Sequence, residues 1–254
     1  MSQLEPNQIA DAEMIGSDWK GLCRLGGAAA LILLLYSVVT MIVLTLLGVA
    51  PSTAAECFAM LQNNRIVGLL RLDILTVFVY MPLCYLLFLG IYIALRRTNG
   101  AYATLATVLV FAGITLFLAT PSAFSMMVLS DKYALATTDA QRSQLLAAGE
   151  AILASDMWHG TGAIIGSMLL QSGALLISVV MLQGKIFSKA IAYVGILTHG
   201  LDLAHLIFLL LVPGLGTILM AIAGTLYLIW FPLVGLRLLQ LGREKPDRPV
   251  QKNN

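Results

Sequence analysis

The feature that most constrains this chain is a series of six apolar runs, each long enough to cross a lipid bilayer as a helix. The runs cover residues of about 25–49, 66–95, 102–130, 160–182, 190–212 and 216–241. A helix needs about 20 mainly apolar residues to cross the hydrocarbon core. In lipid, only helices and closed barrels satisfy every backbone hydrogen bond. The sequence therefore predicts an all-α, polytopic transmembrane helix bundle of about six spans.

The composition agrees with lipid as the solvent of this chain. Hydrophobic residues make up 59% of the 254 positions and charged residues 11%, whereas soluble domains carry about 25% charged residues. The formal net charge is +2, and no dense basic face is available to neutralise phosphates. This argues against a nucleic-acid partner and leaves membrane lipids as the expected partners. The three scattered cysteines predict no disulfide framework.

The apolar runs also define the domain organisation. Residues 1–24 contain four acidic side chains and precede a run that is too long for a signal peptide. We therefore interpret 1–24 as a cytoplasmic N-terminal segment, 25–241 as one transmembrane domain, and 242–254 as a basic, disordered cytoplasmic tail. Within the domain, Pro82 predicts a kink in the second run and Pro121 a break in the third.

Two polar segments between the spans carry helix-start patterns. Thr53 is followed by Glu56, and Thr138 by Gln141, which is the spacing of a capping box. Apolar residues then recur on one side of each segment. We expect two amphipathic helices that lie on the membrane surface.

The distribution of lysine and arginine predicts the orientation, because cytoplasmic loops are enriched in positive residues. Eleven basic residues fall on one side of the predicted spans, and Arg65, Arg71, Lys132 and Arg142 on the other. The eleven are Lys20, Arg24, Arg96, Arg97, Lys185, Lys189, Arg237, Arg243, Lys245, Arg248 and Lys252. Both chain ends are therefore predicted to be cytoplasmic and the two amphipathic helices external, in a multi-pass protein of the cytoplasmic membrane.

A few polar side chains lie at lipid depth, where a central charge costs roughly 2.5 to 3.5 kcal/mol on insertion scales. They include all three histidines of the chain and, in the predicted topology, fall in the outer half of the bundle. They are Arg71 and Asp73 in the second run, Asp156, His159 and Gln171 at or in the fourth, and His199, Asp202 and His205 in the fifth. We interpret them as candidates for an outward-facing polar pocket.

Several functions remain open for this pocket. Asp202 shares a helix face with both His199 and His205, so the group could bind or transport a small molecule or a lipid headgroup, or simply neutralise buried charges as structural pairs. A ceramidase-like zinc-dependent hydrolase would use His159, His199, His205 and Asp202. A haem would need His159 opposite His205. No enzyme class or cofactor is assigned, since nucleotide-binding and nucleophile motifs are lacking.

Two short stretches resemble a known family. His159-Gly160-Thr161-Gly162 followed by Ile165-Gly166, and the basic loop 184–189 leading into Gly195-Ile196-Leu197, are similar to a bacterial family of integral membrane proteins catalogued as domain-of-unknown-function family 4386. The resemblance covers about 20–240 and implies the fold and a bacterial cytoplasmic membrane, but no activity. A homodimer, or a structural or regulatory role beside another membrane protein, stays open.

Overall fold

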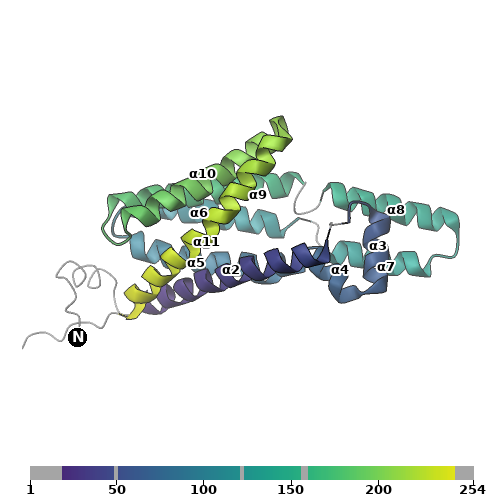
Figure 1. The fold of residues 1–254 in the computed structure, drawn as a ribbon, viewed down its shortest axis with the longest axis horizontal. Helices are drawn as coiled ribbons and strands as arrows, with labels where there is room; N and C mark the ends of the chain where they lie inside the picture. Colours follow the sequence, from purple (N-terminus) through teal and green to yellow (C-terminus); the bar gives the residue numbers. More distant parts are fainter. Residues whose placement is uncertain (1–18, 49–50, 121–122, 156–159, 244–254) are drawn as a thin grey trace, which may run out of the picture.

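The computed structural model of the chain describes residues 19–48, 51–120, 123–155 and 160–243. The regular elements within these ranges are helices (Figure 1). Six of them are long and apolar enough to cross a membrane: Lys20–Leu47, Thr76–Leu95, Gly100–Leu135, Thr161–Gln183, Lys189–Leu211 and Pro213–Arg243. The prediction of an all-helical chain with six candidate spans is confirmed. The side of the membrane on which each end lies stays a prediction.

The candidate spans form a ring in chain order. Each long helix packs against the one before it, and the last helix returns to pack against the first. Figure 1 shows the last helix crossing obliquely from its predecessor to the first helix. In order, the helices are α2 (Lys20–Leu47), α5 (Met81–Leu95), α6 (Gly100–Leu118), α9 (Thr161–Gln183), α10 (Lys189–Leu211) and α11 (Pro213–Arg243). The connections after α5, α9 and α10 are short, as is usual for antiparallel neighbours in a bundle, whereas those after α2 and α6 contain further helices.

Glycines bring α6 and α9 into backbone contact. A Cβ atom at Gly166 would lie 2.7 Å from the carbonyl oxygen of Gly113, and one at Gly173 would lie 2.5 Å from that of Ala106. Small residues allow this approach in membrane bundles, where association depends on close packing rather than on the hydrophobic effect. The α6 and α9 pair therefore tolerates no side chain at these positions.

The second span differs from the continuous kinked helix predicted over 66–95. The predicted run starts with a separate helix, α4 (Arg65–Arg71), and breaks at Leu72 and Asp73. The candidate span itself begins at Thr76 with a π-helical turn, η2 (Thr76–Tyr80), that leads into α5. Asp73 has φ of 57°, a left-handed conformation that non-glycine residues seldom adopt. Pro82 lies in the first turn of α5. Because proline has no N–H and displaces the carbonyl one turn earlier, the irregularity precedes it.

The third span continues further than its predicted end at about Ser130. Its first part, α6, ends at Leu118, and its second part, α7 (Ala123–Leu135), extends five residues beyond Ser130. Pro121, which predicted the break, lies outside the described residues. α8 (Asp139–Ala154) then runs back beside α7.

The predicted helix starts at Thr53 and Thr138 are confirmed. The Thr53 hydroxyl accepts a hydrogen bond from the Glu56 N–H, and the Thr138 hydroxyl accepts one from the Gln141 N–H, each at 3.2 Å. The Glu56 carboxylate in turn accepts from the N–H of Ser52 at 2.7 Å. This bond lowers the pKa of Glu56, a fully exposed carboxyl. Both starts therefore satisfy backbone donors that a helix leaves unpaired.

The two amphipathic helices pack against protein. The apolar side of α3 (Ala54–Asn63) is buried against α7 and α8 through Cys57, Phe58 and Met126. The N–H of Ala54 also donates to Glu150 of α8 at 2.7 Å. We call α3, α4, α7 and α8 the end layer. It lies at one end of the bundle (Figure 1). The apolar face of α3 is therefore occupied by α7 and α8, so membrane lipid is not its partner.

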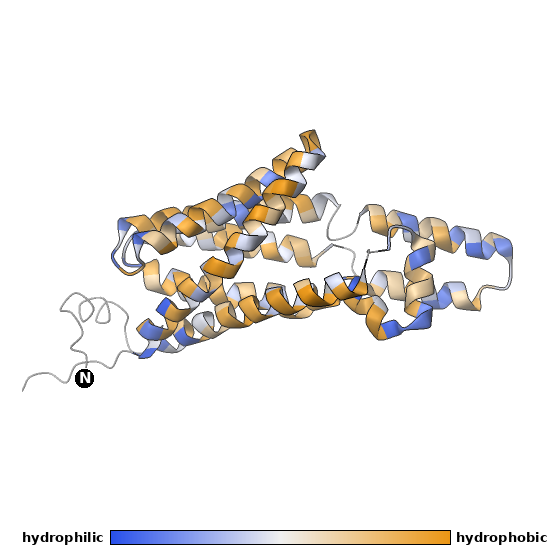
Figure 2. Ribbon diagram, viewed as in Figure 1, coloured by the Kyte–Doolittle hydropathy of each residue, from blue (hydrophilic) through white to orange (hydrophobic). Residues whose placement is uncertain are grey.

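The opposite end of the bundle gathers basic residues. Arg24 Nε donates to the carbonyl of Gly242 at 2.6 Å, and Arg237 Nε to that of Ile186 at 2.6 Å. The Arg96 guanidinium lies 4.3 Å from the ring centre of Trp19. Figure 2 shows hydrophilic residues concentrated at the two ends and hydrophobic ones along the spans. Those of the eleven basic residues that the structure describes thus lie at the end of the bundle opposite the end layer.

Candidate functional site

Four polar side chains from three spans meet in one hydrogen-bonded group. Gln171 of α9 donates from Nε2 to Asp202 Oδ2 of α10 at 2.6 Å. The Tyr227 hydroxyl of α11 donates to the same oxygen at 2.8 Å. His199 Nδ1, also on α10, lies 2.9 Å from Gln171 Oε1. We call Gln171, His199, Asp202 and Tyr227 the polar network.

The hydrogen bonds of the polar network determine where its protons lie. An amide oxygen can only accept, so the contact with Gln171 Oε1 requires a proton on His199 Nδ1. The shortest contact of the Tyr227 hydroxyl is to Asp202, at 2.8 Å, against 3.1 Å to Gln171 and 3.3 Å to His199. His199 Nε2 then carries a lone pair in the neutral imidazole. It is buried and has no hydrogen-bond partner among the described residues.

Aromatic rings enclose the imidazole. His199 is 1% exposed. It meets Trp230 edge to face at 4.7 Å between ring centres and lies 6.3 Å from Phe88. A Cβ atom at Gly195 would lie 2.6 Å from Trp230 Nε1, so glycine is needed beside the indole. Since a buried acceptor without a partner costs free energy, His199 Nε2 needs an explanation.

Asp202 has no cationic partner within ion-pair distance in the part of the chain that the structure describes. The ion pair found there joins Arg65 to Asp131 at 2.7 Å, with both side chains more than half exposed. Asp202 is half-buried, and its hydrogen bonds within the described residues reach Oδ2. His205 lies within electrostatic range of Asp202 but beyond ion-pair distance, so the carboxylate has no direct ion pair, which lipid depth makes expensive.

Of the predicted pocket residues, the structure brings together His199, Asp202 and Gln171. His205 Nδ1 instead contacts the carbonyl of Gly216 at 3.0 Å, at the turn between α10 and α11. Arg71 and Asp73 do not join the polar network either. Arg71 donates to the carbonyl of Gly48 at the end of α2, Asp73 lies at the break in the second span, and Asp156 and His159 fall outside the described residues.

The histidines of α10 do not form a shared metal site. His199 and His205 are six residues apart, which separates them by about 9 Å along the axis and puts them on different faces of the helix. Within the described residues, no group of three or more histidine, cysteine, aspartate or glutamate side chains could hold a metal ion. His159, the third histidine of the predicted zinc set, lies outside this part of the chain, so that hypothesis is untested.

Sequence reasoning missed three aromatic residues at the site. Tyr227 completes the polar network, Trp230 packs on His199, and Tyr80 of η2 lies near enough to Asp202 for an electrostatic interaction. Tyr227 and Trp230 stand three residues apart in an otherwise apolar run. Side chains three residues apart lie on the same face of a helix. A hydroxyl and an indole N–H at this spacing in an apolar run could have identified Tyr227 and Trp230 as site residues.

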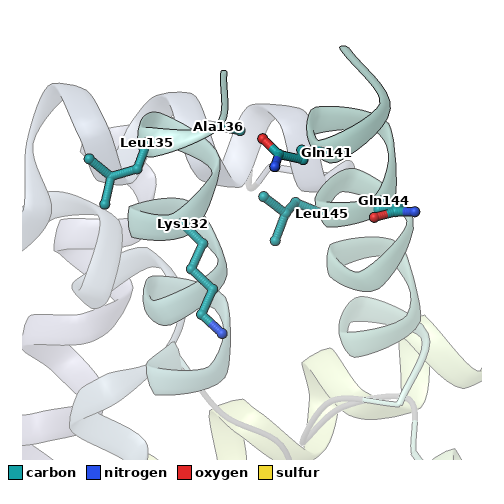
Figure 3. Close-up of a pocket in the computed structure, with 6 residues that line it drawn as sticks. All are labelled: Lys132, Leu135, Ala136, Gln141, Gln144 and Leu145. Carbon is teal, nitrogen blue, oxygen red and sulfur yellow. The ribbon is translucent and has the colours of Figure 1, made fainter. Parts of the chain in front are cut away.

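A separate pocket opens in the end layer, between α7 and α8 (Figure 3). Its volume is about 400 Å³. Its described lining contains one charged group, the side chain of Lys132, and Leu135 beside it is 81% exposed. The lining consists of Lys132, Leu135, Ala136, Gln141, Gln144 and Leu145. These residues provide no acid, thiol or imidazole, so the pocket offers no catalytic set.

Comparisons with known proteins add no identification. No protein-family model, no curated protein and no solved structure matches the chain. The six candidate spans indicate a multi-pass membrane protein.

Proposed function

We propose that this protein is a multi-pass protein of the bacterial cytoplasmic membrane that binds a small polar molecule, a solute or a lipid headgroup, at the polar network. The observation that carries the proposal is His199 Nε2, a buried acceptor without a partner among the described residues, two hydrogen bonds away from the Asp202 carboxylate. A ligand that donates a hydrogen bond, such as an alcohol or an ammonium group, would satisfy that acceptor.

The composition of the polar network supports a binding role over a purely structural one. Buried polar groups that serve only stability are satisfied by their neighbours, and a half-satisfied network is less stable than an apolar core. Here Gln171 and Tyr227 each make several hydrogen bonds within the network. His199 Nε2 and the neighbouring Trp230 Nε1 are buried without a partner among the described residues, and both bonds to Asp202 reach Oδ2. A ligand that makes hydrogen bonds to these unused groups would satisfy the network.

The broken second span supports the same role. Discontinuous helices recur at substrate sites of membrane transporters, and π-helical turns recur at functional sites. Here the break at Asp73 leads into η2, whose Tyr80 lies near Asp202. Irregular backbone thus stands beside the polar network.

The depth of Asp202 gives the direction of access. It is 13 residues from Lys189 at the basic end of α10, about 20 Å along the helix, and nine residues from the last helical residue, Leu211. Asp202 and Tyr227 are half-buried, whereas His199 is buried. Asp202 thus lies nearer to the end that carries the end layer, which the basic residues predict to be external, and we expect the ligand to enter from that end.

Diethyl pyrocarbonate tests this proposal, because it acylates unprotonated imidazole and reaches only sites that open to small molecules. We expect it to modify His199 in the folded protein in mild detergent, as measured by peptide mapping with mass spectrometry. His205→Gln is the matched control and should leave the rate at His199 unchanged, whereas Asp202→Asn, which alters the network itself, should change it. If His199 reacts only after unfolding, the polar network is a sealed structural group and the binding role is wrong.

A further inference from the structure

We infer that Asp202 carries one exchangeable proton, so that ligand binding at the polar network is linked to the protonation state of this carboxyl. This deepens the proposed function, on which it rests, by naming the proton as the ion to which binding is linked. The inference depends on the charge balance and the hydrogen-bond pattern around Asp202 and His199.

The charge balance requires a cation or a proton. Gln171 and Tyr227 each donate to Asp202 Oδ2, but both are neutral groups. In the described part of the chain, no lysine, arginine or histidine lies within ion-pair distance of Asp202, and its Oδ1 accepts no hydrogen bond. A proton on Oδ1 neutralises the carboxyl and leaves both donors to Oδ2 in place.

The polar network offers two alternative positions for that proton. Asp202 Oδ1 is one, and His199 Nε2, the unpartnered nitrogen, is the other. Gln171 bridges the two residues, since its amide donates to Asp202 and its carbonyl accepts from His199. With one proton bound at either position the network is neutral overall. With none it carries the charge of Asp202.

The groups that face the polar network from the neighbouring elements carry no fixed positive charge within the described residues. They are Tyr36 of α2, Tyr80 of η2, Cys84 of α5, His205 of α10 and Trp230 of α11, in addition to the network residues of α9, α10 and α11. His205 is engaged with the Gly216 carbonyl. The His205 imidazole lies within electrostatic range of Asp202 and offsets its charge only when it is itself protonated, so compensation of Asp202 depends on a bound proton.

Hydroxyl groups lead from Asp202 toward the break in the second span. Tyr80 interacts with Asp202 and lies 5.3 Å from Tyr36 between ring centres. The Tyr36 hydroxyl is hydrogen-bonded to Thr76 at 2.8 Å and lies within electrostatic range of Asp73. Hydroxyl groups thus lie between Asp202 and the break in the second span, on the side from which we expect the proton to arrive.

Dicyclohexylcarbodiimide tests the inference, because this apolar reagent reacts with protonated carboxyl groups inside membranes. The full-length protein in native membranes is labelled between about pH 6 and pH 9, and the rate at Asp202 is measured by peptide mapping. We expect labelling at neutral pH that falls as the pH rises, approaching tenfold per pH unit above the midpoint. Asp202→Asn should abolish it, and the carboxyl of Asp139, exposed at the start of α8, is the internal control that stays unlabelled.

Two results would overturn the inference. Asp202 that is unlabelled at every pH is permanently ionised, and Asp202 labelled at a rate independent of pH is permanently protonated. If either result occurs while diethyl pyrocarbonate still modifies His199 in the folded protein, the inference about the Asp202 proton is wrong and the proposed binding site is retained. If His199 is also unreactive in the folded protein, both proposals fail.

Discussion

Gln171→Leu is expected to destabilise the protein more than other single substitutions of similar size on α9. Gln171 makes hydrogen bonds to His199, Asp202 and Tyr227. Replacing it leaves the buried His199 Nδ1 with only the longer 3.3 Å contact to the Tyr227 hydroxyl and removes one of the two donors to the carboxylate. Each buried group left unsatisfied costs about 1–3 kcal/mol, so we expect a loss of about 3 kcal/mol, measured as a lower midpoint of thermal unfolding in detergent.

Gln183→Leu is the matched control for Gln171→Leu. Gln183 ends the same helix, is exposed, and accepts one hydrogen bond from Asn99 at 2.8 Å, so its loss should cost less than about 1 kcal/mol. A double variant, Gln171→Leu with Asp202→Leu, should recover part of the stability, because it also removes the carboxyl that Gln171→Leu deprives of a hydrogen-bond donor. Equal midpoints for the two glutamine variants would contradict the assigned network.

Gly113→Leu is expected to prevent α6 and α9 from packing. A Cβ atom at Gly113 meets the Gly166 carbonyl oxygen and, at 2.5 Å, the backbone nitrogen of Leu170. These are backbone atoms, which cannot rotate away. Overpacking in cores that can adjust costs about 1–3 kcal/mol, and a leucine against backbone exceeds this range. We expect little folded, monodisperse protein by size-exclusion chromatography in detergent.

Gly224→Leu is the control for Gly113→Leu. Gly224 lies within α11, and a Cβ atom there would have nothing within 4 Å. The variant adds the same apolar volume to a candidate span at an open position, so the yield of folded protein should match that of the unsubstituted chain. A normal yield of Gly113→Leu would show that α6 and α9 are further apart than the structure places them.

The spans and helix caps could be predicted because they depend on local sequence. Length and hydrophobicity define a membrane-crossing helix whatever it packs against, and the caps at Thr53 and Thr138 need only residues three positions away. The gathering of His199, Asp202 and Gln171 was predicted in the same way, since depth follows from the residue count along each span. Their contacts within the bundle confirm the proximity and leave the binding role as a proposal.

The remaining features depend on contacts between distant segments. Tyr227 joins the polar network because α11 lies across α10, and nothing in its own run shows which neighbour its hydroxyl meets. The turn after α10 places the Gly216 carbonyl within hydrogen-bond distance of His205. No proline or glycine stands at the break at Leu72 and Asp73, and Pro82 lies nine residues after Asp73. Sequence spacing alone could not assign these positions.

The most direct test of the six-span arrangement is to measure on which side of the membrane each loop between the spans lies. In a background without the three native cysteines, single cysteines replace exposed residues at the basic end, Arg97 and Lys185, and at the opposite end, Gln144 and Gly214. We expect a membrane-impermeant maleimide, added to intact cells, to label Gln144→Cys and Gly214→Cys and to reach Arg97→Cys and Lys185→Cys only after lysis. Labelling of Arg97→Cys or Lys185→Cys in intact cells would contradict the arrangement, and with it the depth of the polar network.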